Sequence, residues 1–417
     1  MKELLSVCLS LCIMVSAFVS FDITASAKTT LKKTTVSASN ISNGINVSWK
    51  KVSGAKSYKV YRKAPGAKKY SVVKKTNSKT VKYLDKKVSA GKTYSYQVVA
   101  VKGKETSKSK TKSITRLLAP KNVKVQSYAS KTDCTLKGSK ADYVFDNVFN
   151  FDSKLGVKIT WNKSKGANKY DIYRKVDNSK KYRKIKTVGN ISTYVDRESF
   201  FSVVNLSYKV VARKNTSASD YSTIRKICYV EPSYIFTHSL SDELLVSWTQ
   251  VAGCDGYKLY RSLTGKAGSY SYIGKYTTKE YKYEEKNAEL GKTYYYKLVA
   301  YKGSNNSVGL TIKEKYEPVM TVNLNVGDTS DSVQKQFKKT LAKINKDLKR
   351  NMSDLYQEVT FDKIMESVRI ESKDEDIATV SKDYIITAVS QGTIKAPIIQ
   401  KLGNFELEKG FILINAN

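Results

Sequence analysis

The feature that most constrains this chain is a segment that occurs three times. The copies are WKKVSGAKSYKVYRK from Trp49, WNKSKGANKYDIYRK from Trp161 and WTQVAGCDGYKLYRS from Trp248, and together they contain every tryptophan of the chain. In each copy a glycine precedes a run of alternating apolar and polar residues, and Tyr-Arg follows that run. Alternation of this kind predicts a half-buried strand, and the glycine predicts the turn that leads into it.

A second recurring position, a tyrosine, lies at a nearly constant distance from each tryptophan. Tyr96, Tyr208 and Tyr296 follow the three tryptophans by 47, 47 and 48 residues. A nearly constant internal period of this length predicts repeated domains. We therefore divide the chain into four parts after residue 27: repeat 1 (28–116), repeat 2 (117–230), repeat 3 (231–317) and a terminal domain (318–417).

Residues 1–27 form a separate segment. Lys2 is followed by an apolar run from Leu4 to Phe21 and then by the small-residue sequence Ala25-Ser26-Ala27. This pattern predicts a secretory signal peptide that is removed before Lys28, and hence a secreted or cell-wall associated protein without stable membrane insertion after cleavage. Retention of the apolar run as a membrane anchor is the alternative.

The pattern of repeat 1 predicts an antiparallel β-sandwich. Seven short alternating runs are separated by turn residues, which is typical of that architecture. We expect strands at Lys33–Ser37, Ile45–Lys50, Tyr58–Lys63, Tyr70–Lys74, Thr80–Tyr83, Thr93–Val101 and near Lys112. The fold class that follows is all-β, with tandem antiparallel β-sandwiches and one helical insertion in the terminal domain.

Repeat 1 closely resembles the fibronectin type III-like domain, in the version found in exported bacterial proteins. The resemblance is carried by Trp49, by Tyr58 and Val60, and by the run from Gly91 to Ala100. It implies that the hydroxyl of a tyrosine near the start of the sixth strand accepts a backbone hydrogen bond, the tyrosine corner. Tyr94 and Tyr294 occupy that position in repeats 1 and 3. Repeat 2 has Leu206 there, so we expect no such bond in it.

Repeat 2 also carries an insertion of about two dozen residues ahead of Trp161. It contains four aromatic residues, Tyr143, Phe145, Phe149 and Phe151, interleaved with aspartates. Loops on a rigid scaffold often carry binding residues, so the insertion is a candidate ligand site. The alternative is that the aromatics cover a sheet edge or the neighbouring repeat.

The terminal domain resembles the bacterial immunoglobulin-like domain of the second type. The matching positions are Ser372, Ile377–Val380, Thr387, Ala388, Gly392 and Ile394. The middle departs from that family, because residues 331–350 predict a helix with Val333, Phe337, Leu341, Ile344 and Leu348 on one face. Asp331 and Gln334 are a candidate capping box, and we expect the helix to pack on the sheet of its own domain.

The charge is unevenly distributed. The chain carries a net charge of +37, and residues 28–317 hold 59 of the 74 basic and 21 of the 37 acidic side chains, while 318–417 hold 14 of each. A field of this size attracts anionic polymers, which for an exported protein are cell-wall polymers, acidic polysaccharides or extracellular nucleic acid. Lysine greatly outnumbers arginine and lacks its planar fork, so specific nucleic-acid recognition is disfavoured.

The sequence offers little for catalysis and predicts no cofactor or metal site. His238 is the only histidine, which leaves the three cysteines after residue 27, Cys134, Cys228 and Cys254, without the usual catalytic arrangement. We expect three small buried thiols, with a Cys134–Cys228 pair as the alternative. Glu406 and Glu408 are expected to form a solvated pair on the last strand. These features favour a protein that is not an enzyme.

One outward face recurs in the three repeats. Because Tyr58 and Val60 point inward, the alternation places Tyr61 and its counterparts Tyr173 and Tyr260 on the outside, beside Lys59, Asp171 and Lys258. Tyrosine combines a flat apolar ring with one hydroxyl, which suits sugar rings and protein interfaces. These three tyrosines are candidate ligand contacts. Cross-strand packing on the exposed side of the sheet is the alternative.

The sequence thus predicts a secreted adhesion protein that holds anionic or glycan surfaces, such as cell wall or polysaccharide, through its basic repeats. Other surface proteins are a further class of partner. The first alternative is a structural spacer or scaffold without a ligand of its own. The second is an enzyme of unfamiliar type, with the repeat 2 insertion and the terminal domain as its candidate sites.

Overall fold

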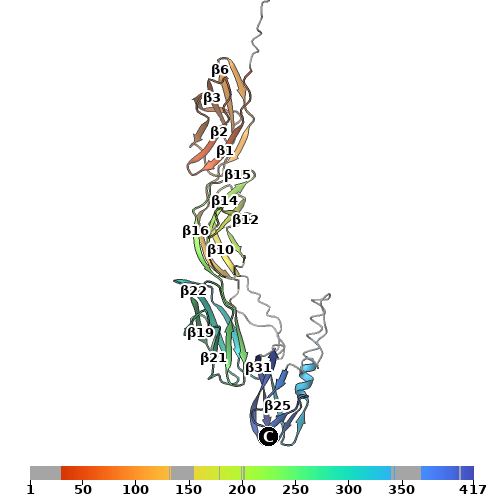
Figure 1. The fold of residues 1–417 in the computed structure, drawn as a ribbon. Coiled ribbons are helices and arrows are strands. Elements are labelled where there is room, and N and C mark those ends of the chain that lie inside the picture. Colours follow the sequence, from red (N-terminus) through yellow and green to blue (C-terminus); the bar gives the residue numbers. More distant parts are fainter. Residues whose placement is uncertain are drawn as a thin grey trace, which may run out of the picture. The chain divides into compact units, whose positions relative to one another are not determined.

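The structure, a computed structural model, describes residues 30–130, 132, 155–177, 179–198, 200, 202–339, 342, 368–402 and 405–417. The described chain divides into two compact units. The first contains the residues up to Leu117 together with Asn215–Ser219, and the second contains Leu118–Lys214 and Asp220–Asn417. Almost every described element is a strand, as Figure 1 shows. No helix among the described residues is long and apolar enough to cross a membrane.

Repeat 1 forms two antiparallel sheets that enclose one core. The three-stranded sheet has the order β1 (Val36–Ile41), β2 (Gly44–Trp49) and β5 (Lys82–Asp85). The larger sheet has the order β4 (Ser71–Asn77), β3 (Ser57–Lys63), β6 (Thr93–Lys102) and β7 (Glu105–Lys108), and β8 (Lys112–Thr115) also pairs with β6. The first unit also includes the short strand β15 (Ser217–Ala218). The core between the sheets contains Ile45, Trp49, Tyr58, Val60 and Tyr96.

Two strand predictions for repeat 1 were wrong. The first strand runs over Val36–Ile41 and not over Lys33–Ser37, because its partner Gly44–Trp49 fixes the register, with Val36 opposite Trp49. The strand Glu105–Lys108 was missed. It carries only polar residues, and it forms because it continues the edge of the larger sheet beside Val99–Lys102.

The repeated sequence segment builds the same turn three times. The rings of Trp49 and Tyr58 pack with their centroids 5.5 Å apart, and the Tyr58 hydroxyl accepts the backbone N–H of Val52 at 2.8 Å. Gly54 between them has a φ of 80°, a left-handed conformation that favours glycine. Tyr170 and Tyr257 accept the equivalent N–H bonds from Ser164 and Val251, also at 2.8 Å.

Repeat 2 has the same arrangement in the second unit. Its three-stranded sheet has the order β13 (Thr193–Asp196), β10 (Leu155–Asn162) and β9 (Lys121–Ala129). Its larger sheet has the order β12 (Arg183–Val188), β11 (Lys169–Val176) and β14 (Val203–Lys214), with β16 (Arg225–Val230) also on β14. The aromatic insertion with Tyr143, Phe145, Phe149 and Phe151 lies outside the described residues, and so does Cys134.

Repeat 3 follows the same plan. Its three-stranded sheet has the order β17 (Ile235–Ser239), β18 (Leu244–Trp248) and β21 (Lys282–Glu285). Its larger sheet has the order β20 (Ser271–Tyr276), β19 (Gly256–Ser262), β22 (Thr293–Lys302) and β23 (Asn305–Asn306), with β24 (Leu310–Lys315) also on β22. Cys254 is buried in this core, and neither it nor the half-buried Cys228 forms a disulfide with another described residue.

The tyrosine-corner prediction is confirmed. The Tyr94 hydroxyl accepts the backbone N–H of Ser89, and the Tyr294 hydroxyl accepts that of Glu289, each at 2.9 Å. Leu206 has no hydroxyl and packs in the core of repeat 2 instead.

The terminal domain consists of two sheets that enclose one core. One sheet has the order β25 (Met320–Leu324), β31 (Phe405–Ala416), β30 (Gly392–Leu402) and β27 (Val368–Ile370), with β25 parallel to β31. The other has the order β26 (Thr329–Ser330), β29 (Ile386–Ala388) and β28 (Ala378–Val380).

The predicted helix of the terminal domain is described over 332–339. Val333 and Phe337 face the domain core, and the Phe337 ring meets Tyr384 edge to face at 5.3 Å, so the packing prediction is confirmed for this part. The carbonyl of Asp331 accepts the N–H of Lys335, which places Asp331 at the N-cap. Gln334 accepts a bond from Lys338. Leu341, Ile344 and Leu348 lie among residues whose side chains are not described.

Repeat 3 and the terminal domain share part of a core. Phe411 of β31 is fully buried among the core residues of repeat 3, and its ring lies 5.8 Å from that of Tyr316. The expected solvated pair on this strand was wrong for Glu408. That carboxylate accepts the backbone N–H of Ser241 at 2.5 Å and its hydroxyl at 3.2 Å, while Glu406 pairs with Arg369. The core of repeat 3 therefore extends past its predicted boundary at 317, and the division into domains stays a prediction.

Candidate functional site

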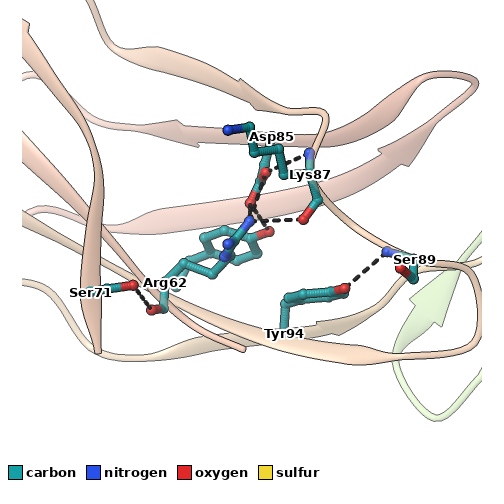
Figure 2. Close-up of polar contacts among 7 residues, drawn as sticks. Arg62, Ser71, Asp85, Lys87, Ser89 and Tyr94 are labelled. Atoms are coloured by element: carbon teal, nitrogen blue, oxygen red, sulfur yellow. Dashed lines mark hydrogen bonds and ion pairs between the residues drawn. The ribbon is translucent and has the colours of Figure 1, made fainter. Parts of the chain in front are cut away.

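A buried ionic network fixes the strand that carries each candidate tyrosine. In repeat 1 the guanidinium of Arg62 donates to both carboxylate oxygens of Asp85, at 2.9 and 3.0 Å, and to the carbonyl of Lys87 (Figure 2). The Tyr96 hydroxyl donates to the same carboxylate at 2.9 Å. Asp85 is fully buried, so it needs these partners to remain in the core.

The same three-part network occurs in the other repeats. In repeat 2, Asp196 accepts from Arg174 at 2.9 Å and from Tyr208 at 2.8 Å. In repeat 3 a glutamate takes the place of the aspartate: Glu285 accepts from Arg261 at 2.5 Å and from Tyr296 at 3.4 Å. The arginine in each case directly follows the outward tyrosine on β3, β11 or β19, so the network anchors the neighbour of each candidate residue.

These networks are structural and not acid–base couples. Burial raises the pKa of Tyr96, Tyr208 and Tyr296, and the adjacent carboxylate raises each further. Because tyrosine begins from a pKa near 10, all three hydroxyls remain donors at any physiological pH. Sequence reasoning missed the network, although a signal was present in the recurrence of Arg62, Arg174 and Arg261 with Asp85, Asp196 and Glu285 at nearly constant spacing.

The structure places Tyr61, Tyr173 and Tyr260 on the outward side of the larger sheets, as predicted. All three are half-buried. Across the strand pairing, Tyr61 lies opposite Gln97, Tyr173 opposite Lys209 and Tyr260 opposite Lys297. Repeats 2 and 3 therefore carry a lysine where repeat 1 carries an amide.

In repeat 2 that lysine lies among three aromatic rings. The Lys209 ammonium is 3.6 Å from the ring centroid of Tyr221 and 4.0 Å from that of Tyr182. Tyr173 meets Tyr221 edge to face at 5.4 Å. Burial beside the rings lowers the pKa of Lys209. A cation this close to aromatic faces is attracted by their negative π surfaces.

Repeat 3 repeats the arrangement. The Lys297 ammonium lies 4.7 Å from the ring centroid of Tyr260 and 5.1 Å from that of Tyr270. Tyr260 meets the exposed Tyr272 edge to face at 5.6 Å. We call the outward residues Tyr173, Tyr182, Tyr221 and Lys209 of repeat 2, with Tyr260, Tyr270, Tyr272 and Lys297 of repeat 3, the tyrosine–lysine faces.

Repeat 1 has a more polar version of this face. Gln97 donates to the Thr111 hydroxyl at 2.8 Å, and Tyr70 shares a hydrogen bond with the same hydroxyl at 3.3 Å. The Lys108 ammonium lies 5.9 Å from the Tyr70 ring.

One outward residue differs from its prediction. Asp171 was expected to be exposed beside Tyr173, but it is buried. It pairs with Arg213 at 2.7 Å and accepts the hydroxyl of Thr187 at 2.6 Å. Arg213 and Thr187 replace its solvent, because a carboxylate leaves water only when a cation and hydrogen bonds take the place of water.

The tyrosine–lysine faces combine two recognition elements. Cross-strand packing, the alternative interpretation, does occur for Tyr173 and Tyr260, and it holds the rings in fixed positions. At the same time Tyr221 and Tyr272 remain about half exposed, at 48% and 56%. Each face thus presents flat rings with phenol groups and a lysine ammonium, which suits hydroxylated and anionic ligands.

No family model matches the chain, and no curated protein matches it. Among solved structures, the FN1–FN3 domains of chicken CNTN1 align at 17% identity over 69% of this chain and 99% of that chain, with a TM-score of 0.20. A segment of two fibronectin type III domains from chicken tenascin aligns at 14% identity over 47% of this chain and 98% of that chain, with a TM-score of 0.24.

The strand order and pairing described above, and not these scores, identify the sandwiches. Each repeat has a three-stranded and a larger antiparallel sheet, a tryptophan on the second strand and a buried tyrosine on the third. The repeats are fibronectin type III-like in this architectural sense.

Proposed function

We propose that this chain is an exported adhesion protein that holds anionic or glycan surfaces, such as cell wall or acidic polysaccharide, through its basic repeats. In this proposal residues 1–27 are a cleaved signal peptide. The terminal domain, of the bacterial immunoglobulin-like type, is presented at the end of the repeats and carries no net charge of its own.

The observation that carries the proposal is the position of lysine on the repeats. Residues 28–317 hold a net charge of +38, and in repeats 2 and 3 a lysine lies at the centre of an aromatic face. The summed charge attracts anionic polymers over a distance. The exposed rings and hydroxyls then offer short-range contacts with sugar rings.

Support also comes from the rigidity of these faces. Each outward tyrosine is followed by an arginine anchored to a buried carboxylate, at 2.9 Å for Arg62 and Arg174. Side chains held in place lose less conformational entropy when a ligand binds. A spacer without a ligand has no requirement for lysine at both central positions.

The proposal is tested with the full mature chain on immobilised acidic polysaccharide and on isolated cell walls. The variant Lys209→Gln with Lys297→Gln removes both central ammoniums. Its matched control, Lys335→Gln with Lys373→Gln, removes the same charge from exposed positions of the terminal domain. We expect weaker retention for the first variant and unchanged retention for the control.

A third variant, Lys209→Met with Lys297→Met, keeps the aliphatic stems against the rings and removes only the charge. We expect it to behave like the glutamine variant. Equal retention of all variants on every surface, or equal losses from the repeats and from the terminal domain, would refute the proposed role of these faces.

A further inference from the structure

A groove of about 630 Å³ lies on the three-stranded sheet of repeat 2, on the opposite sheet from the tyrosine–lysine face. Its lining includes Lys124 of β9, Lys158 and Thr160 of β10, and Thr193 of β13, together with the amides of Asn122 and Asn162. None of the described residues that line it carries a carboxylate. Its volume lies in the range of about 300–1,000 Å³ that is usual for small-ligand sites.

A β-bulge shapes one wall of this groove. Thr160 pairs with Lys124, but Asn162, two residues later, pairs with Lys121, three residues earlier, so β9 carries one extra residue. Asn122 within that bulge has a φ of 51°, a left-handed conformation that asparagine tolerates. Bulges bend the strand and redirect its side chains, and they often lie beside binding sites.

The other repeats lack both the lysine and the β-bulge at this place. Counting from the tryptophans, repeat 1 has Asn46 and repeat 3 has Leu245 where repeat 2 has Lys158. The pairings of β1 with β2 and of β17 with β18 run without a register shift. The groove of repeat 2 is therefore a local addition to the shared sandwich.

The residues that line the groove favour one chemical class of ligand. The described lining holds two ammoniums and no carboxylate, which favours an anionic ligand. The Lys158 ammonium lies 5.4 Å from the Tyr128 ring centroid. Lysine acts as a point charge, so its ammonium can pair with a carboxylate without a fixed geometry. The amides and hydroxyls around the lysines can exchange hydrogen bonds with sugar hydroxyls.

We propose that this groove binds a short segment of an acidic polysaccharide, with carboxylates at Lys124 and Lys158 and sugar hydroxyls at Thr160, Asn162 and Thr193. The inference rests on the proposed attraction to anionic glycans, and it adds a defined, saturable site. The tyrosine–lysine faces would hold the polymer broadly, while the groove would recognise a few sugar units.

The test is titration calorimetry of the full mature chain with a tetramer of galacturonic acid at 0.15 M salt. We expect saturable binding with one site per chain. Lys124→Gln with Lys158→Gln should weaken it about tenfold or more, since hydrogen bonds to charged groups are among the stronger ones. The control is Lys226→Gln, on the exposed side of β16 in the same repeat. Lys158→Arg keeps the charge and should retain most binding, which separates loss of charge from loss of fold.

Two further probes decide the role of the hydroxyls. A neutral glucose tetramer should not bind, and Thr193→Val should weaken the acidic tetramer while leaving thermal stability unchanged. Binding that is unaffected by the lysine pair overturns the proposal. So does binding of inorganic polyphosphate as strong as that of the tetramer, with no effect of Thr193→Val.

The two proposals fail separately. If long polysaccharide is retained but the tetramer does not bind, the groove is refuted and the broad adhesion stands. If the tetramer binds at the groove but polymer and cell walls are not retained, the adhesion proposal is refuted and the groove stands.

Discussion

At the scale of single residues, buried charges with full sets of partners recur through the molecule. Asp85 is bonded by Arg62, Tyr96 and the backbone N–H of Lys87. Glu408 accepts two hydrogen bonds from the uncharged donors of Ser241. Asp85 is fully buried and paired with a guanidinium, whereas Glu408 is half-buried and hydrogen-bonded to Ser241, so the two carboxylates should respond oppositely to mutation.

The network of Arg62 provides the first prediction. Arg62→Met should destabilise repeat 1 by about 3 kcal/mol or more, because it leaves a buried carboxylate without its cation. Arg261→Met should cost less, since the Arg261 side chain is 41% exposed against 18% for Arg62 and water reaches that site. Urea unfolding followed by hydrogen exchange of peptides from each repeat measures both. Equal costs at the two positions would contradict the account.

Glu408 provides the second prediction. Burial raises the pKa of its carboxyl above the usual value, and the two bonds from Ser241 oppose that shift without reversing it. Since the folded state then holds the proton more tightly than the unfolded state, the contribution of Glu408 to stability increases as pH falls through the raised pKa towards about 4.5, and is smaller at neutral pH.

Glu408→Gln, which keeps an acceptor for Ser241, should therefore be neutral or stabilising at pH 7 and should flatten the acid side of the stability profile. Thermal melting between pH 4 and pH 7 tests this. The control is Glu406→Gln, which removes the partner of Arg369 at the surface. It should leave unchanged the part of the pH dependence of stability that Glu408 contributes. A large loss of stability in Glu408→Gln at pH 7 would show that the charge is needed.

At the scale of elements, the repeated turn is the unit that the sequence predicts best. The alternation around Tyr58 and Val60 is local, and one buried side per strand is enough to predict the faces. Pairing across the sheets is not local. The register that moves the first strand to Val36–Ile41 depends on the adjacent strand Gly44–Trp49. The bulge at Asn122 and the cover over Asp171 depend on residues farther along the chain. None of the three could be predicted from a single run.

The same reasoning applies to the candidate site. The outward position of Tyr61, Tyr173 and Tyr260 follows from alternation, and the structure confirms it. Their partners Lys209 and Lys297 lie more than thirty residues away and meet them only through strand pairing. The roles of Tyr143, Phe145, Phe149 and Phe151 stay a prediction.

The turn leads to the third prediction. Trp49→Ala should cost about 3–5 kcal/mol, because it removes the largest side chain of a packed core and leaves a cavity. The indole N–H of Trp49 has no hydrogen-bond partner among the described residues, so Trp49→Phe should cost much less than the alanine change. Hydrogen exchange should show loss of protection in repeat 1 while repeat 3 keeps its own. Simultaneous loss in all three repeats would contradict independent cores.

At the scale of the whole molecule, the cores within the second unit are not all separate. Phe411 of the terminal domain is buried with Trp248, Tyr257 and Tyr316 of repeat 3. The Lys395 ammonium also lies 5.1 Å from the Tyr316 ring centroid. Repeat 3 should therefore lose stability when the terminal domain is removed at residue 317.

The fourth prediction follows from that shared core. Phe411→Ala should destabilise repeat 3 by about 3–5 kcal/mol, in addition to its effect on the terminal domain. The matched control is Phe337→Ala, which lies in the terminal core alone. Hydrogen exchange of the peptides around Ile235–Ser239 separates the two, since only the first variant should expose them. If Phe411→Ala leaves those peptides protected, the shared core does not contribute to stability.

The most direct measurement of the central claim is retention of the full mature chain on an immobilised acidic polysaccharide over a salt series. We expect retention to fall steeply with salt, because the screening length decreases from about 10 Å at 0.1 M to about 3 Å at 1 M and the net charge of +38 on residues 28–317 acts over a distance. Reversing the charge of exposed lysines on the repeats should reduce both the retention and its salt dependence, and the same change on the terminal domain should reduce neither. Retention that salt leaves unchanged, or that depends on the terminal domain, would contradict the account.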